Sequence, residues 1–381
     1  MRSAAVGWTQ GTKRAAVSLV AAAALLGEGS ACTTFVLEAE DGPLFGRNYD
    51  WATGVGRLTV NPRGSRRTAL VAEGRVPVRW TARYGSVTFD QYGRDFATGG
   101  MNEMGLVVEV MWLEGTVYSE RDPRPELDEL QWVQYQLDTA RTVQEVLDSD
   151  RHVRISRESV PLHFLVADRS GRAAAIEFLD GRMVAHAGEA LPIKALANSR
   201  YDESVAFVRQ GGRGMGEPDA PAFRRGSLGR FATVARGIAA ARPRGADAVA
   251  AAFDLLSRAA QAGSTRWSIV YDLRDLRAHF RTPDRPSTRF VDVGRLDYAC
   301  GGAALSLDLE GEGAGDVAGK LAPCDARCNR AAIAAAFAAT GWTISPEDLE
   351  RRARHPETAA CEGPTSPESR RSAGPGSPGR P

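Results

Sequence analysis

Short apolar runs separated by turn signals predict strands in the first part of the chain. The segment 32–51, CTTFVLEAEDGPLFGRNYDW, predicts two strands that meet at the turn signal Asp41-Gly42-Pro43. The run 105–113, GLVVEVMWL, predicts another strand, and the Gly99-Gly100 pair before it is typical of a turn. Because these runs are short and bounded by glycine, proline or aspartate, the pattern favours strands over helices.

Two further segments predict antiparallel pairing in the middle of the chain. Residues 161–186 contain three apolar runs that are separated by Asp-Arg-Ser-Gly and by Asp-Gly, which is typical of a meander. Residues 266–282, RWSIVYDLRDLRAHFRT, predict one more hairpin.

Helical patterns occur in separate blocks. Residues 127–140 predict one helix, and residues 142–147 predict a second that begins with Thr142 and Glu145 as a capping box. Further helices are expected at 227–241, 246–260 and 330–339. Since strands and helices do not alternate strictly, the sequence predicts an α+β fold with antiparallel sheets and segregated helices.

The composition is that of an ordinary globular protein, and it excludes one class of partner. Hydrophobic residues make up 43% of the 381 residues and charged residues 25%. The formal net charge is +1, and lysine and arginine form no long blocks. We therefore expect no nucleic-acid partner, because that class of binding depends on concentrated positive charge.

Residues 1–31 are typical of a secretory signal. Basic residues precede an apolar run at 15–26, and Gly29 and Ala31 occupy positions −3 and −1 of a cut before Cys32. The apolar run is too short to cross a bilayer, so no stable membrane anchor is expected. The sequence therefore predicts cleavage before Cys32 and a periplasmic or secreted protein.

An even number of cysteines follows Cys32, as is common in compartments that permit disulfides. They are Cys300, Cys324, Cys328 and Cys361. The spacing of Cys324 and Cys328 resembles half of a metal site, but no histidine or second close cysteine pair completes a tetrahedral set. We expect disulfides or free structural thiols and no metal, and the disulfide connectivity stays open.

Two segments are expected to be loosely structured. Residues 211–223, GGRGMGEPDAPAF, predict a surface loop, and residues 355–381 predict a disordered tail rich in Pro, Gly, Ser and Arg. The glycines of the loop lack the strand-to-helix context of a nucleotide-binding loop. The predicted organisation is a signal peptide at 1–31, one folded domain at 32–354, and the tail.

A chain that begins at Cys32 would combine a nucleophile and a base in one residue. The free α-amine has an ordinary pKa of about 7.7 to 8.0, so it can take the thiol proton and return it to a leaving amine. Such a site also needs a cation for the thiolate, a carboxylate for the amine, and two N–H donors for the oxyanion. Arg47 and Asp50 are candidates, because the predicted hairpin folds them back beside Cys32.

Four segments carry a family resemblance. The Cys-Thr start of 32–51 continues through a DG turn to FGR-x-x-D, and GGMNEMGLVVEVMWL follows at 99–113. LANSRYDES at 196–204 and SLGRF at 227–231 come later, in the family's order. Together they resemble the choloylglycine hydrolase family, which includes penicillin V acylases and conjugated bile salt hydrolases. The resemblance covers most of the chain from residue 32 to about residue 292.

This resemblance implies an N-terminal nucleophile hydrolase fold, a four-layer αββα sandwich of two antiparallel sheets, with no cofactor. The domain at 32–354 would then be the catalytic domain. Cys32 is implied to be the nucleophile and base, and Arg47 and Asp50 to support its thiol and amine. Arg230 is implied to complete the charged cluster.

The resemblance also assigns the oxyanion donors, and apolar side chains nearby are candidates for an acyl pocket. The side chain of Asn198 and the backbone N–H of Trp112 are implied to stabilise the oxyanion. Trp51, Met111 and Trp112 are expected to bind the apolar acyl part of the substrate. Trp112 stands where bile salt hydrolases usually carry asparagine, and together with Trp51 it resembles the penicillin V acylase-like branch of Gram-negative bacteria.

The implied activity is hydrolysis of a linear amide C–N bond through an acyl-thioester. The substrate would be a small-molecule amide such as penicillin V or an N-acyl homoserine lactone, and relatives suggest a homotetramer. Three alternatives stay open: acyl transfer to another amine, conjugated bile salt hydrolysis, and a non-catalytic lipoprotein lipidated at Cys32. Gly29 disfavours the lipoprotein, because a lipidation signal usually has leucine or a similar apolar residue at −3.

Overall fold

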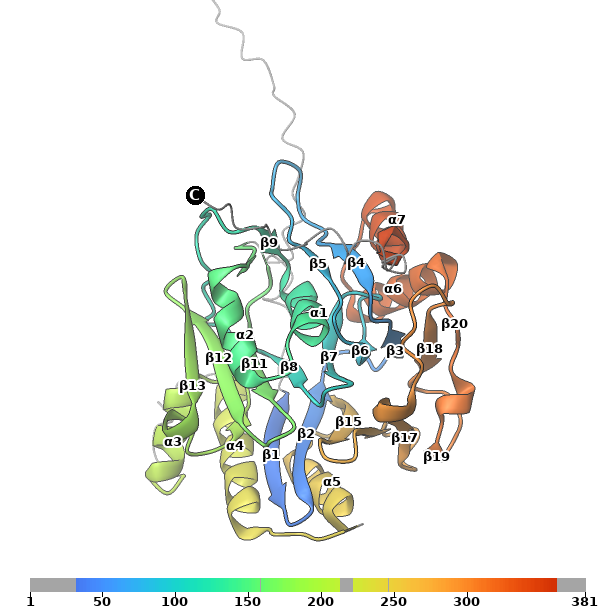
Figure 1. Cartoon of the computed structure of the whole chain (residues 1–381). Helices are drawn as coiled ribbons and strands as arrows, with labels where there is room; N and C mark the ends of the chain where they lie inside the picture. Colours follow the sequence, from blue (N-terminus) through green and yellow to red (C-terminus); the bar gives the residue numbers. More distant parts are fainter. Residues whose placement is uncertain (1–31, 158, 213–221, 246, 362–381) are drawn as a thin grey trace, which may run out of the picture.

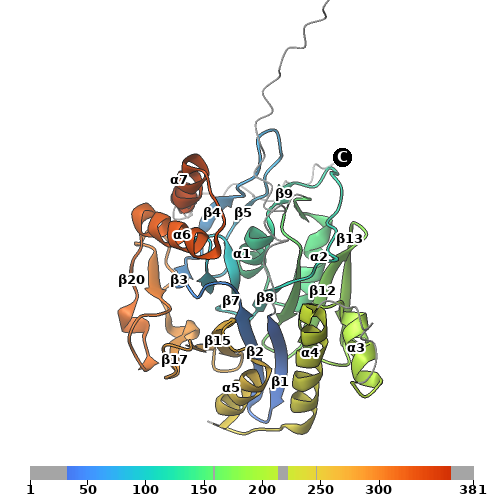
Figure 2. The same cartoon turned by 180° about the vertical axis from the view of Figure 1, so that it is seen from behind.

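The structure is a computed structural model that describes residues 32–157, 159–212, 222–245 and 247–361. Three predicted features lie outside the described residues: the signal segment 1–31, most of the loop at 211–223, and the tail after residue 361. Within the described chain, two large β-sheets pack against each other, and helices cover their outer faces (Figures 1 and 2).

The first sheet contains the strand that follows Cys32. Its seven strands have the order β14-β1-β2-β15-β16-β17-β19. Their bounds are Thr33–Ala39 (β1), Gly42–Asp50 (β2), Ala195–Leu196 (β14), Thr265–Asp272 (β15), Arg277–Arg281 (β16), Arg289–Asp292 (β17) and Gly315–Asp316 (β19). Neighbouring strands are antiparallel except for the parallel edge pair β17 and β19.

The second sheet is antiparallel and has nine strands in the order β13-β12-β11-β8-β7-β6-β3-β18-β20. Their bounds are Arg57–Asn61 (β3), Ser86–Asp90 (β6), Ala97–Asn102 (β7), Val107–Trp112 (β8), Leu162–Ala167 (β11), Ala173–Leu179 (β12), Arg182–Ala187 (β13), Leu305–Asp308 (β18) and Ala322–Pro323 (β20). Two small sheets lie beside it. They join β9 (Glu126–Leu127) to β10 (Arg154–Ile155), and β4 (Ser65–Thr68) to β5 (Arg79–Thr81) and β21 (Ala360–Cys361).

Helices form the two outer layers. Their bounds are Glu129–Thr139 (α1), Val143–Asp148 (α2), Tyr201–Arg209 (α3), Ala222–Ala240 (α4), Asp247–Ala259 (α5), Ala326–Thr340 (α6) and Pro346–Arg354 (α7). Helices α4 and α5 pack on β1, β2 and β15, while α1 packs on β7 and β8 of the other sheet (Figures 1 and 2). The predicted four-layer αββα sandwich is therefore confirmed. Among the described residues, no helix combines the length and apolar character needed to span a bilayer.

The local signals in the sequence explain most of these elements. The hairpin β1–β2, the meander β11–β12–β13 and the hairpin β15–β16 lie where the sequence predicts them. The Asp180-Gly181 turn has positive φ at both residues, which aspartate and glycine tolerate best. At the start of α2, the Thr142 side chain accepts the Glu145 N–H as predicted. In a full capping box the Glu145 side chain would accept the Thr142 N–H, but here it accepts the Arg141 N–H.

The prediction of a turn at Gly99-Gly100 is wrong. Both glycines lie inside β7, where Gly99 pairs with Glu109 and Gly100 with Val108 of β8. A Cβ at Gly99 would overlap the Glu109 carboxylate, and a Cβ at Gly100 would overlap the backbone of β6. These glycines are therefore needed for close approach within a sheet, which is the other common reason for glycine in a strand.

The expected start of the disordered tail at residue 355 is also wrong. Residues His355–Thr358 form a 3-10 helix, and β21 pairs with β4 at Cys361 and Ser65. A disulfide joins Cys361 to Cys300, and a second joins Cys324 to Cys328 at the start of α6. The disulfide interpretation of these cysteines is confirmed, and the folded region extends at least to residue 361.

The Cys300–Cys361 disulfide is expected to stabilise the protein more than the Cys324–Cys328 disulfide. The first spans 61 residues and the second only 4, and the loss of chain entropy in the unfolded state grows with loop length. Replacing both Cys300 and Cys361 by serine should lower the free energy of unfolding by about 4 kcal/mol, against about 2 kcal/mol for the matched pair Cys324 and Cys328. Urea unfolding of the two variants measures the difference, and equal losses would contradict the assignment.

Candidate active site

Cys32 lies buried at the start of β1, directly beside the end of β2. The register Thr33↔Asn48 and Thr34↔Arg47 brings the first residues of β1 next to the last residues of β2. The Cys32 Sγ atom is 3.9 Å from the backbone oxygen of Asp50. Burial raises the pKa of the Cys32 thiol, and the positive charge of Arg47 opposes part of that rise. The hairpin thus places the candidate nucleophile, cation and carboxylate together.

Arg47 is held between the two sheets. Its side chain is fully buried and forms an ion pair with Glu109 of β8, which is also fully buried. Nη1 donates to the backbone oxygen of Thr98 at 2.6 Å, and Nη2 donates to that of Val110 at 3.2 Å. A buried guanidinium needs such partners, because it cannot recover its lost hydration otherwise. Strand β2 therefore presents a cation beside Cys32 whose ion pair and backbone hydrogen bonds come from the opposite sheet.

Glu109 is a residue that the sequence interpretation missed. Its Oε1 accepts a hydrogen bond of 2.6 Å from the Tyr271 hydroxyl, so β15 also supports it. Gly99, directly opposite on β7, leaves the space that the carboxylate occupies. The available signal was a lone charged residue inside the apolar run GLVVEVMWL, since a buried charge calls for a buried partner.

Asp50 has one carboxylate oxygen bound and one free. Oδ1 accepts a hydrogen bond of 2.5 Å from the Thr265 hydroxyl, whereas Oδ2 is buried without a hydrogen-bond partner among the described residues. Burial raises the pKa of Asp50 to about 6, although the Thr265 hydroxyl and the charges of Arg230 and Arg47 act in the opposite direction. The carboxylate can therefore accept one further N–H beside Cys32.

Asn198 and Trp112 meet at the edge of β8. The Asn198 Nδ2 atom donates to the Trp112 backbone oxygen at 2.8 Å. The Leu113 N–H donates to the backbone oxygen of Pro161, on the β11 side of β8. Because the N–H groups of successive residues in a strand point to opposite edges, the Trp112 N–H points to the other edge of β8. On that edge, β7 pairs with β8 only as far as Gly99 and Glu109. The edge of β8 beyond Glu109 is therefore open to Asn198. The second hydrogen of the Asn198 amide and the Trp112 N–H are thus two neighbouring donors.

Arg230 of α4 connects Asn198 to the start of β1. Its Nη2 donates to Asn198 Oδ1 at 3.1 Å, and its Nε donates to the Thr33 hydroxyl at 3.0 Å. Nη1 is buried without a hydrogen-bond partner among the described residues. Burial lowers the pKa of Arg230, while the nearby Asp50 acts to raise it. All six predicted catalytic residues therefore lie in one cluster.

A buried polar network behind Asn198 was also missed by the sequence interpretation. The His163 Nε2 atom lies 2.7 Å from the backbone oxygen of Ala197, and Glu177 Oε1 accepts the Tyr201 N–H at 2.9 Å. Burial opposes ionisation of Glu177, but hydrogen bonds from His163 and His186 lower its pKa to about 2. Both ends of the segment that contains Asn198 are thereby fixed to β11 and β12.

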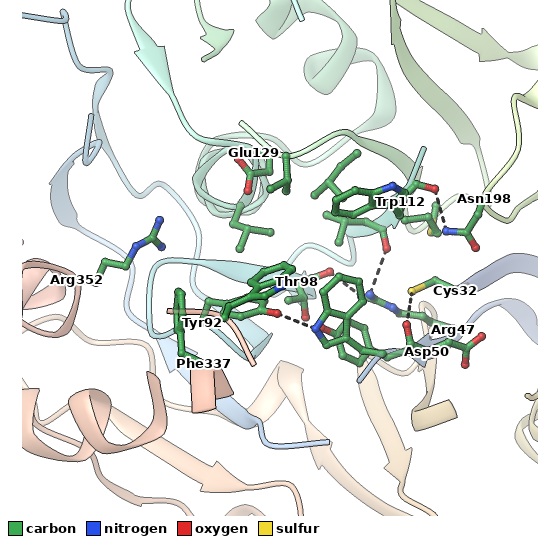
Figure 3. A pocket seen from close by; sticks show the side chains of 18 residues that line it. Cys32, Arg47, Asp50, Tyr92, Thr98, Trp112, Glu129, Asn198, Phe337 and Arg352 are labelled. Atoms are coloured by element: carbon green, nitrogen blue, oxygen red, sulfur yellow. Dashed lines mark hydrogen bonds between the residues drawn. The ribbon is translucent and has the colours of Figure 1, made fainter. Parts of the chain in front are cut away.

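Cys32 lies at one end of a cavity of about 710 Å³, a volume that includes its opening to solvent. Figure 3 shows Cys32, Arg47, Asp50 and Asn198 together at one end, with Arg352 at the opposite end. The three residues expected to bind the acyl group all line the cavity. They are Trp51, Met111 and Trp112. Aromatic and aliphatic side chains form most of the remaining wall, so the cavity suits an apolar group.

Comparisons with known proteins agree with this geometry. Residues 32–212 match the family model for linear amide C–N hydrolases, choloylglycine hydrolase family. A penicillin V acylase from Pectobacterium atrosepticum is 28% identical over 342 residues, covering 77% of this chain and 89% of that protein.

Solved structures show the same relationship. The structure of a penicillin V acylase from Agrobacterium tumefaciens is 29% identical with a TM-score of 0.66, and the match covers 77% of this chain and 97% of that one. A conjugated bile acid hydrolase from Clostridium perfringens, 16% identical, has the same fold with a TM-score of 0.59 over 75% of this chain and 98% of that one.

The αββα sandwich thus places the chain among proteins with the N-terminal nucleophile hydrolase fold. Within that class, residues 32–212 match the choloylglycine hydrolase family, and the chain is a hydrolase of linear amide C–N bonds.

Gly99→Ala is expected to destabilise the protein, because the added Cβ would displace the Glu109 carboxylate from Arg47. Overpacking of this kind costs about 1 to 3 kcal/mol in the free energy of unfolding, which denaturant titration can measure. Gly115→Ala is the matched control, since a Cβ there meets no atom within 4 Å. Equal stability of the two variants would show that the space beside Glu109 is not required.

Proposed function

We propose that the mature chain is an exported amide hydrolase with Cys32 as its N-terminal nucleophile. The observation that carries this proposal is the position of the Cys32 thiol, buried at the end of an apolar cavity beside a cation, a carboxylate and two N–H donors. Two disulfides support export, because such bonds persist in oxidising compartments. Residues 1–31 would supply the signal, and their removal would create the α-amine of Cys32.

The reaction begins when the α-amine takes the proton of the Cys32 thiol and the sulfur attacks the amide carbonyl carbon. The oxygen of the tetrahedral intermediate becomes an anion, which the Asn198 amide and the Trp112 backbone N–H stabilise. The C–N bond then breaks, and the leaving amine receives the proton from the Cys32 ammonium. Water attacks the remaining acyl-thioester with the same amine as base, which releases the acid and restores the thiol.

The charged neighbours have separate tasks in this scheme. Arg47 favours the thiolate, because its cation is fixed beside Cys32 by Glu109 and two backbone oxygens. Asp50 orients the α-amine through its unpartnered oxygen Oδ2. Arg230 holds Asn198 by its side-chain oxygen, which directs the Asn198 amide hydrogens away from Arg230.

The proposed substrate is a linear amide with an apolar acyl group, such as the phenoxyacetyl group of penicillin V or an N-acyl homoserine lactone. The aromatic cavity wall supports this choice, and two of the similar proteins are penicillin V acylases. Lipid attachment at Cys32 is disfavoured by its burial, because the residue is only 6% exposed. Acyl transfer shares the same thioester and remains the nearest alternative reaction.

Cys32→Ala should abolish release of amine from penicillin V, because no other group in this scheme can form the acyl-thioester. We expect a loss of at least about a thousandfold in kcat. Intact mass of the exported wild type should match a chain that starts at Cys32 without an added acyl group. Wild-type turnover by the alanine variant, or a lipid-sized increment in mass, would refute the mechanism.

Thr265→Val should shift the acid limb of the kcat/KM profile to higher pH. The Thr265 hydroxyl stabilises the ionised form of Asp50, so its removal should raise the pKa of Asp50 from about 6 by about one unit. Thr233→Val is the control, because the Thr233 hydroxyl donates to Gly229 of its own helix. An unchanged acid limb in Thr265→Val would mean that Asp50 does not control activity in this range.

A further inference from the structure

The far part of the cavity is built by a segment that the family model does not cover. Phe337 of α6, Trp342 after α6 and Arg352 of α7 all line the cavity that ends at Cys32. The family match spans residues 32–212, so these side chains come from a different part of the chain. Figure 3 shows Phe337 beside Tyr92, on the side of the cavity away from Cys32.

Rings from this segment pack directly on rings from the first half of the chain. The Trp342 ring stacks on the Tyr92 ring with centroids 5.9 Å apart and an interplanar angle of 14°. Trp342 also meets Trp51 edge to face at 5.6 Å, and Phe337 meets Tyr92 in the same manner at 5.6 Å. The Trp51 Nε1 atom donates to the Tyr92 hydroxyl at 2.7 Å, which fixes the two receiving rings. We call Trp51, Tyr92, Phe337 and Trp342 the aromatic wall.

The segment that supplies Phe337 and Trp342 is firmly attached to the rest of the protein. Asn329 of α6 accepts the Arg94 N–H at 3.0 Å through Oδ1 and donates to the Ala353 oxygen of α7 at 2.9 Å. Ile333, one turn further along α6, fills the space above Gly93, where a Cβ would overlap it. The position of α6 therefore depends on the loop that also carries Tyr92.

Ring packing, and not hydrogen bonding, positions Trp342. Its indole Nε1 is buried without a hydrogen-bond partner among the described residues. The stacked contact with Tyr92 and the edge contact with Trp51 are thus the interactions that orient the ring. Such ring pairs are favourable beyond the area they bury, and they offer a flat apolar surface to a ligand in the cavity.

We propose that the aromatic wall determines acyl specificity, and that it selects amides with a bulky aryl acyl group over amides with a short acyl group. This inference rests on the proposed function, because it places the scissile carbonyl at Cys32. Within the wall, Trp51 contacts both Trp112 and Trp342, so it connects the part of the cavity near Cys32 to the rings of Tyr92, Phe337 and Trp342. A phenoxyacetyl group can contact the wall, whereas an acetyl group ends beside Cys32.

The test compares two amides of the same chromogenic amine, one phenoxyacetyl and one acetyl. Trp342→Ala should lower kcat/KM for the phenoxyacetyl amide by about tenfold or more and change the acetyl value by less than about threefold. Ile344→Ala is the matched control, because Ile344 lies two residues away in the same segment and does not line the cavity. A parallel fall for both amides, or no fall for either, would overturn the proposal.

A binding measurement separates this proposal from the proposed function. Calorimetric titration of phenoxyacetate into Cys32→Ala should show binding that the added Trp342→Ala substitution weakens by about tenfold or more. Loss of all turnover in the wild type would refute the proposed function but leave this measurement informative. If Trp342→Ala does not fold, Trp342→Phe serves in its place, and a smaller loss of phenoxyacetate affinity is expected. Equal phenoxyacetate affinity with and without the Trp342 substitution would overturn the role of the wall.

Discussion

The buried ion pair between Arg47 and Glu109 is the constraint on which the site depends. Each residue belongs to a different sheet, and neither side chain reaches solvent. Removing one member of such a pair leaves an uncompensated charge in the interior, which is far more costly than the pair itself. The packing of the two sheets and the position of the cation beside Cys32 are therefore set by the same contact. Tyr271 and Gly99 serve that contact, one by a hydrogen bond and the other by leaving space.

Local signals in the sequence predicted the parts of the site that depend on short-range structure. The Asp41-Gly42 turn determines that β1 and β2 pair, and this pairing alone brings Arg47 and Asp50 to Cys32. Asn198 and Arg230 lie far from Cys32 in sequence, and physical reasoning from their own surroundings gave no reason to single them out. Only the family resemblance did so, because their contact depends on the packing of α4 against β1.

The features that the sequence did not reveal arise from contacts across the sandwich or between distant segments. Gly99 has the appearance of a turn glycine until Glu109 is placed opposite it in the sheet. The pairing of Cys300 with Cys361 cannot be deduced from spacing, and β21 was hidden in a segment with the composition of a disordered tail. The start of α7 did carry a signal, since Ser345 caps the helix and Pro346 occupies its first turn.

The two disulfides and the free thiol of Cys32 impose a requirement on how the protein matures. Oxidation has to join four cysteines and spare the fifth, although all five belong to one chain. The fold provides this selectivity by location: Cys32 lies between the sheets, whereas Cys300 and Cys361 meet beside β4 and Cys324 and Cys328 meet at the start of α6. Folding of the sandwich before oxidation would shield the Cys32 thiol from mispairing, so an early reducing interval would favour correctly paired chains over scrambled ones.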